Sequence, residues 1–196
     1  MRQLGASSSA LNSPKLTHGA NPPHEAEKNR GVRPLGFVIY LLTFNCYGTH
    51  LRGDERGSVD RARDGRGGPM EPSPLLTDYA KRTMTHVEAR LDLGESFLVL
   101  KAIRETCVFR QWPLLVAHVR STHAHLIVSG VVDASCAIRG FKAYASRALN
   151  REGVRRRWAR GGNARLLRDT MAVQAAVRYV ADRQGPPMTL YVAPER

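Results

Sequence analysis

The sequence lacks any apolar run long enough to cross a membrane. Of its 196 residues, 42% are hydrophobic, yet no stretch approaches the roughly 18 consecutive apolar residues of a transmembrane helix. It also lacks a lipidation motif, a basic amphipathic helix and, at its start, the apolar core of a secretory signal. These features predict one soluble domain with no membrane partner, and the length suffices for one substantial core.

Cysteine is scarce, and its spacing excludes two common uses. Cys46, Cys107 and Cys136 are odd in number and far apart in the chain. This pattern predicts neither a disulfide framework nor a CxxC zinc site. We expect three small buried thiols in the reducing environment of the cytoplasm.

Acidic residues are few relative to basic ones. Thirty Lys and Arg stand against 17 Asp and Glu, which gives a formal net charge of +13 and a pI near 10.5. A charge of this sign and size favours a polyanionic partner, and the planar guanidinium group of arginine suits phosphate. The composition therefore predicts a nucleic-acid partner rather than an anionic membrane surface.

The chain divides into a tail and one domain. Residues 1–33 contain Ser7-Ser8-Ser9 and several prolines without sustained periodicity, which predicts a disordered basic tail; residues 34–196 form the domain. Hydrophobic periodicity predicts strands at 37–44, 114–120 and 123–128, helices at 75–93, 95–111, 133–150 and 170–184, and a hairpin or irregular loop at 155–169. Strands and helices mixed around a β-hairpin indicate an antiparallel α+β fold.

Two histidines one residue apart are the strongest chemical signal in the chain. His123-Ala124-His125 opens the apolar run 126–128. On a strand both imidazoles project from one face, whereas on a helix they would lie about 200° apart and could not share a cation. The motif therefore predicts half of a metal site.

Four features in this order resemble a known family. In chain order they are the segment 47–60, the histidine-hydrophobic-histidine strand, a basic helix at 142–147, and the late helix containing Arg178-Tyr179-Val180. Together they resemble the single-tyrosine HUH-endonuclease transposases of minimal bacterial insertion sequences and their REP-associated relatives. The resemblance runs from about residue 37 to 191 and implies an HUH-type catalytic domain at 34–196. It also implies a ferredoxin-like, RNA-recognition-like antiparallel sheet with helices packed mainly on one face.

The resemblance also implies an activity. Such a transposase nicks and rejoins single-stranded DNA through a covalent 5′-phosphotyrosine, with Mg²⁺ or Mn²⁺ polarising a phosphoryl oxygen. The partner it implies is single-stranded DNA at an element end that carries a DNA hairpin, in the bacterial cytoplasm near the nucleoid. Both monomers and homodimers fit.

Tyr179 is the predicted nucleophile. It lies at the margin of an apolar stripe formed by Val173, Ala176, Val177 and Val180, from which its hydroxyl could reach the sheet. Tyr144, on the preceding helix, is the alternative nucleophile.

The third metal ligand is where the chain departs from the family pattern. Family members commonly carry Gln or Asn four positions after the tyrosine, and here that position is Arg183, which has no lone pair to donate. Asp182 offers a hard oxygen on the same helix face, and Gln184 offers an amide of the expected type. Gln184 is slightly favoured, and Asp182 remains open.

The basic residues that follow the histidine strand predict a path for phosphates. They are Arg139, Lys142, Arg147, Arg151, Arg155, Arg156 and Arg157. Neutralising many phosphates releases counterions, so we expect salt-sensitive DNA binding. The alternative function, favoured by Arg183, is a domesticated protein that binds single-stranded nucleic acid on the same scaffold without cleaving it.

Overall fold

A computed structural model describes residues 38–60, 68–131, 133–150, 156–184 and 188–194. Residues Leu35–Arg196 belong to one compact unit. The tail predicted at 1–33 lies outside the described residues.

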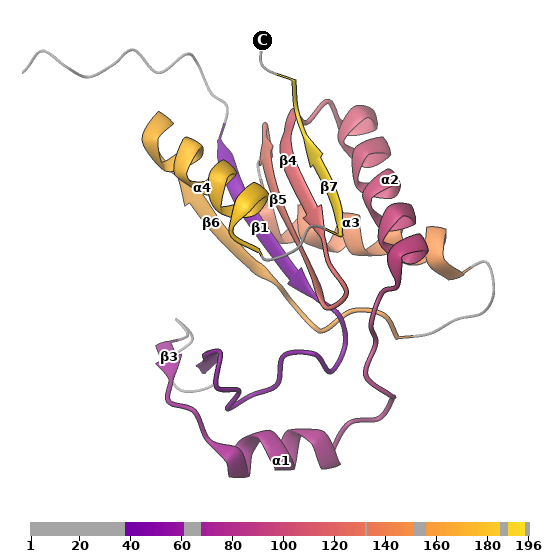
Figure 1. Cartoon of the computed structure of the whole chain (residues 1–196), viewed down its shortest axis with the longest axis vertical. Helices are drawn as coiled ribbons and strands as arrows, with labels where there is room; N and C mark the ends of the chain where they lie inside the picture. The colour runs from indigo at the N-terminus through magenta and orange to yellow at the C-terminus, as the bar shows by residue number, and fades with distance from the viewer. Residues whose placement is uncertain (1–37, 61–67, 132, 151–155, 185–187, 195–196) are drawn as a thin grey trace, which may run out of the picture. The chain divides into compact units, whose positions relative to one another are not determined.

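The core of the domain is a five-stranded antiparallel sheet (Figure 1). Its order is β6-β1-β5-β4-β7, with β1 at Ile39–Asn45, β4 at Leu114–Val119, β5 at His123–Ser129, β6 at Asn163–Leu167 and β7 at Thr189–Val192. The helix α2 (Leu93–Arg110) connects β1 to β4, and α3 (Ala134–Leu149) connects β5 to β6. Two split β-α-β units with this strand order define a ferredoxin-like sheet, so the predicted α+β class is confirmed; β7 extends the sheet beyond β4.

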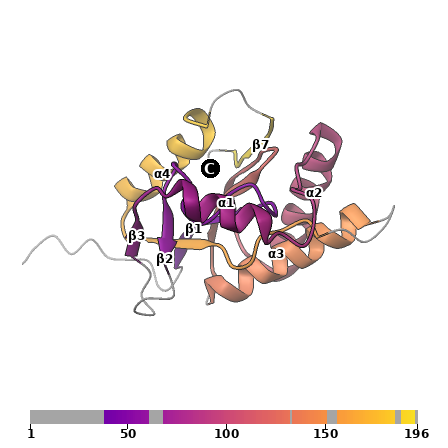
Figure 2. The same ribbon diagram turned by 90° about the horizontal axis from the view of Figure 1, so that it is seen from below.

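Helices cover the two faces of the sheet unequally. Leu42, Phe44 and Leu126 point toward α2 and α3 and share one apolar cluster with residues of these helices. The alternate residues Val116 and Ile127 pack on the other face, against α4 (Thr170–Asp182). Two helices therefore lie on one face and one on the other (Figures 1 and 2).

The helix boundaries follow from local capping chemistry. The Asp92 side chain accepts a hydrogen bond from the Glu95 amide, and the Glu95 side chain accepts one from the Asp92 amide. This capping box starts α2. Gln111 ends that helix in the left-handed region at φ 55°. The Asp169 carboxylate starts α4 by accepting from the Ala172 amide at 2.8 Å.

Two parts of the predicted secondary structure were wrong. The helix expected at 75–93 ends early, because α1 spans Pro74–Arg82 and is capped by Ser73. The segment 155–169 does not form a separate hairpin, since it contains β6, which is an edge strand of the main sheet and pairs with β1. A small separate sheet of β2 (Ser58–Asp60) and β3 (Gly68–Met70) lies in the loop that precedes α1.

The face covered by α2 and α3 should carry much of the stability of the domain. Phe141 of α3 is fully buried there, whereas Phe97 of α2 is 62% exposed. Phe141→Ala should lower the free energy of unfolding by about 3–5 kcal/mol, because a large cavity remains. The matched control Phe97→Ala should change it by only about 0.5 kcal/mol. Urea denaturation measures both, and equal losses would contradict the described packing.

Candidate active site

The two histidines lie on the α4 face of the sheet, within a row of polar residues. Strand pairing aligns Asn163 of β6, Thr43 of β1, His125 of β5 and His118 of β4 across the sheet. His123 is two residues before His125 and therefore shares this face; the two ring centroids are 4.7 Å apart. The strand geometry expected from the sequence is present.

In each of the two imidazoles, Nδ1 forms a hydrogen bond with a threonine hydroxyl. The Thr43 hydroxyl lies 2.7 Å from Nδ1 of His125, and the Thr122 hydroxyl lies 2.9 Å from Nδ1 of His123. Each hydroxyl occupies Nδ1, so either ring would use Nε2 to ligate a cation. Partners of this kind orient metal-binding histidines in other proteins.

Burial keeps the histidine pair neutral. It lowers the pKa of His125 to about 4, and the charge that His123, His118 or Arg120 would add nearby acts in the same direction. Burial also lowers the pKa of His123, while a hydrogen bond with the Gln184 side chain acts in the opposite direction. Neutral imidazoles offer lone pairs to a metal ion without first losing a proton.

The fold brings Tyr179 to the histidine pair. After β6 the chain turns, and α4 runs back over the sheet, held by Ala176 and Val180 against Val116 and Ile127. Tyr179 therefore stands at the end of α4 near the histidines, with its ring centroid 5.9 Å from that of His125 and an interplanar angle of 72°. The tyrosine is 42% exposed, so its ring contacts the site while one side faces solvent.

The residues after Tyr179 differ in how they meet this site. Gln184 interacts with His123 and lies within 3.5 Å of the Tyr179 carbonyl through its amide nitrogen. Asp182 is exposed, and within the described ranges no three His, Cys, Asp or Glu side chains are close enough together to hold a metal ion. Arg183 is also exposed and forms the C-cap of α4. Gln184 is therefore the better placed of the two predicted third ligands.

Positive groups border the site on the side of the loop after β1. Arg56 and Arg120 both lower the pKa of His123 through their charge. The Arg56 guanidinium is fixed by Asp54 and by the Thr49 carbonyl, the latter at 2.7 Å. Arg56 keeps the pKa of Asp54 well below its usual range, so this anchoring carboxylate stays charged.

The basic residues predicted to follow DNA do not form one surface beside the histidines. Arg139, Lys142 and Arg147 belong to α3, which packs on the opposite face of the sheet. The Lys142 ammonium donates to the carbonyls of Ala159 and Gly161, and burial lowers its pKa to about 8. The bonds of Lys142 hold the chain that leads into β6.

The two described arginines of the cluster 155–157 have different environments. Arg156 is exposed, with its guanidinium carbon 4.6 Å from the centroid of the Tyr47 ring, near the end of β1. Arg157 turns inward and pairs with Glu95, and its side chain is only 10% exposed. Arg151 and Arg155 lie outside the described residues. Of this group, Arg156 alone is both described and free to face a ligand near the histidine end of the sheet.

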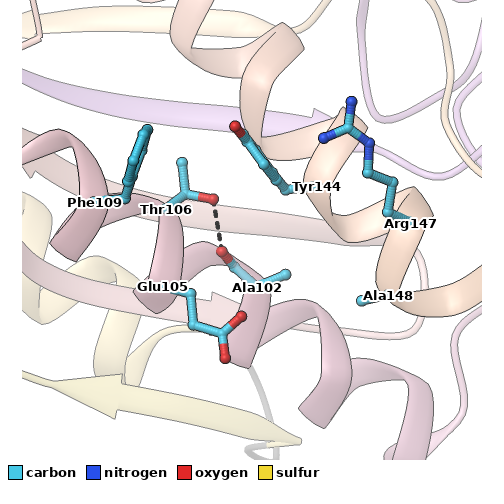
Figure 3. Close-up of a pocket in the computed structure, with 7 residues that line it drawn as sticks. All are labelled: Ala102, Glu105, Thr106, Phe109, Tyr144, Arg147 and Ala148. Atoms are coloured by element: carbon cyan, nitrogen blue, oxygen red, sulfur yellow. Dashed lines mark hydrogen bonds between the residues drawn. The ribbon is translucent and has the colours of Figure 1, made fainter.

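The groove shown in Figure 3 is formed by the two helices that cover the opposite face of the sheet from the histidine pair. It has a volume of about 470 Å³ and lies between α2 and α3, with Thr106, Phe109, Tyr144 and Arg147 in its lining. Tyr144 is therefore on the other side of the sheet from His123 and His125. This placement removes Tyr144 as an alternative nucleophile at that pair.

Sequence reasoning missed three residues of the site. Thr43, Thr122 and His118 contact the histidines or the end of α4, although none belongs to the motif. Thr122 directly precedes the motif, and His118 follows the same strand alternation on the neighbouring strand, so both carried a local signal. Thr43 did not, because its contact depends on the register between β1 and β5.

Comparisons with known proteins leave the family open. No family model matches the chain, and no curated protein matches it. A solved structure of a REP-associated tyrosine transposase bound to a REP hairpin is similar, with 18% identity and a TM-score of 0.42. The match covers 73% of this chain and 64% of that one, so the chain spans less than two thirds of that protein's length.

Among the described helices, none is long and apolar enough to cross a membrane.

The lowered pKa of His125 predicts a pH dependence of stability. The unfolded chain binds a proton near pH 6.5, whereas the folded one does so near pH 4. Protonation of His125 therefore costs the folded state stability. The contribution of His125 to the free energy of unfolding is fully present above pH 6.5 and falls by on the order of 3 kcal/mol as the pH falls toward 4. Chemical denaturation of the wild type and His125→Asn across this range should show their stability difference shrinking on acidification. A constant difference would contradict the prediction.

The hydroxyl of Thr43 should tune metal affinity. If Thr43 orients His125 as a ligand, Thr43→Val should weaken Mn²⁺ binding about 10–100-fold, and Thr43→Ser should retain most of it. Titration calorimetry with Mn²⁺ alone measures both affinities. Equal affinities in the wild type and the valine variant would show that this hydrogen bond has no role in metal binding.

Proposed function

We propose that this protein nicks and rejoins single-stranded DNA, with Tyr179 as the nucleophile and a divalent metal ion held by His123 and His125. The observation that carries the proposal is the contact between Tyr179 and His125. Their ring centroids are 5.9 Å apart, although the two residues lie 54 positions apart in the sequence. A tyrosine, two neutral histidines and an amide at one end of a sheet form a set that phosphoryl transfer can use. The resemblance in the sequence points to the same chemistry and implies a substrate beside a DNA hairpin.

The proposed reaction exchanges one phosphoester bond for another. The Tyr179 phenol loses its proton to solvent, and its oxygen attacks the scissile phosphorus. The bond from phosphorus to the 3′ oxygen breaks, and that oxygen takes up a proton to become a free 3′ hydroxyl. The 5′ phosphate stays on the tyrosine until a 3′ hydroxyl gives up its proton and attacks the phosphorus. The bond from phosphorus to the tyrosine oxygen then breaks, the phenol takes up a proton, and the phosphodiester is restored.

The residues present fit a hard divalent cation. His123 and His125 would ligate through Nε2, and Gln184 would add an amide oxygen. Mg²⁺ or Mn²⁺ bound there would polarise a phosphoryl oxygen and offset negative charge in the transition state. Thr43 and Thr122 orient the two rings, and burial keeps both of them unprotonated.

The charge of the protein supports DNA as the substrate. The formal net charge is +13, and Arg56, Arg120 and Arg156 lie toward the end of the sheet that carries His123. A phosphate backbone entering this end would meet positive charge before it meets Tyr179. The exposed stack of Arg156 on Tyr47 also offers a flat surface for an unpaired base.

One observation favours a second function. Within the described residues, no third His, Cys, Asp or Glu joins the histidine pair, and Arg183 occupies the position that the family pattern gives to an amide. A protein with these features could bind single-stranded nucleic acid without cutting it. The covalent assay below separates the two functions.

The proposed nucleophile can be tested by trapping the intermediate. The wild type, incubated with Mn²⁺ and single-stranded DNA labelled 3′ of the cut, should keep the label after denaturation. Tyr179→Phe should abolish the adduct without changing DNA affinity, since it removes only one hydroxyl, and Tyr144→Phe is the matched control. His123→Ala and His125→Ala should lower adduct formation by at least about a hundredfold.

Two results of this assay would reject the proposal. An adduct that persists in Tyr179→Phe would assign the nucleophile to another residue. No adduct in the wild type with either metal, despite tight DNA binding, would favour the non-cleaving function.

A further inference from the structure

His118 is a buried histidine that the proposed chemistry does not use. It is fully buried, pairs across the sheet with His125, and lies in the same polar row. Its Nδ1 donates to the Val180 carbonyl at 3.0 Å, and its Nε2 accepts from the Met188 amide at 3.4 Å. Both nitrogens are thus occupied, so His118 has no atom left with which to ligate the metal.

The bond to Val180 completes the end of α4. The last four carbonyls of a helix have no partner within the helix, and Val180 is among the last residues of α4. The last turn of α4 contains no basic side chain of its own. His118 therefore supplies, from the sheet, the donor that a helix C-terminus usually obtains from its own sequence.

The two partners of His118 lie on either side of the proposed third ligand. Val180 directly follows Tyr179, Gln184 comes four residues later, and Met188 directly precedes β7. One imidazole thus fixes the chain before and after Gln184. It also fixes the helical turn that carries Tyr179, through the carbonyl of the next residue.

We propose that His118 is a positioning residue, which holds the end of α4 and the start of β7 to the sheet so that Tyr179 and Gln184 stay beside His123 and His125. The proposal rests on the proposed function for its effect on catalysis. The two hydrogen bonds of His118 do not depend on that function, because they are present without DNA or metal.

Two amide substitutions can separate the two bonds of His118. In His118→Asn the amide nitrogen takes the place of Nδ1 and keeps the bond to Val180, but the bond to Met188 is lost. In His118→Gln the amide oxygen reaches the place of Nε2 and keeps the bond to Met188, but the donor to Val180 is lost. His118→Leu loses both, and Ile103→Ala, in the core on the other face, controls for loss of stability.

Two readouts should follow the Val180 bond. Rates of adduct formation should fall only severalfold in His118→Asn, which loses the longer bond to Met188 at 3.4 Å. They should fall about a hundredfold in His118→Gln and His118→Leu, as expected for a misplacement of about 1 Å. DNA affinity should be unchanged. Hydrogen exchange of the Arg183 amide, which bonds to the Tyr179 carbonyl at 3.2 Å, should speed up in the same two variants and not in Ile103→Ala.

The outcomes distinguish this proposal from the proposed function. If the wild type forms no adduct, the proposed function fails, and exchange at Arg183 still decides whether His118 holds the end of α4. If the Asn and Gln variants lose adduct formation equally, or if Ile103→Ala matches His118→Leu in both readouts, His118 is only part of the core and the positioning role is rejected. If His118→Leu does not fold, the comparison of Asn with Gln decides alone.

Discussion

The two-residue period of β5 is the constraint on which the site depends. It sends Ala124, Leu126 and Val128 into the core beneath α2 and α3, and it leaves His123 and His125 together on the other face. Because one face is committed to the core, the strand cannot shift its register by one residue without burying both histidines there. The same packing that stabilises the sheet therefore fixes the pair of imidazoles.

The α4 face combines an apolar contact with two buried histidines of the polar row, His118 and His125. Apolar side chains of α4 dock on Val116 and Ile127, which brings the end of this helix over His118 and His125. A buried polar group without a partner is destabilising, so such a row is tolerated only when its members are bonded. Thr43 bonds to His125, and His118 bonds to the end of α4 and to Met188, which directly precedes β7. Docking of α4 thus gives His118 a hydrogen-bond partner and at the same time places Tyr179 beside His125.

The sequence predicted the central elements of the fold because their signals are local. Periodicity and caps marked α2, α3 and α4, and alternation marked the central strands. The edge strands β6 and β7 are five and four residues long, and their pairing depends on neighbours distant in the chain. Charge alone predicted phosphate contacts for Lys142 and Arg157, which instead hold backbone carbonyls and Glu95. The choice between Asp182 and Gln184 depended on how the chain leaves α4, which residue spacing does not specify.

The central claim is that His123, His125 and Gln184 bind one divalent cation beside Tyr179. Its most direct measurement is the anomalous scattering of manganese in crystals of Tyr179→Phe grown with Mn²⁺ and a single-stranded oligonucleotide. We expect a manganese peak ligated by Nε2 of both histidines and the Gln184 amide oxygen, with a phosphate oxygen of the DNA completing the contact near residue 179. Manganese bound elsewhere, or DNA bound with no metal at the histidine pair, would contradict the claim.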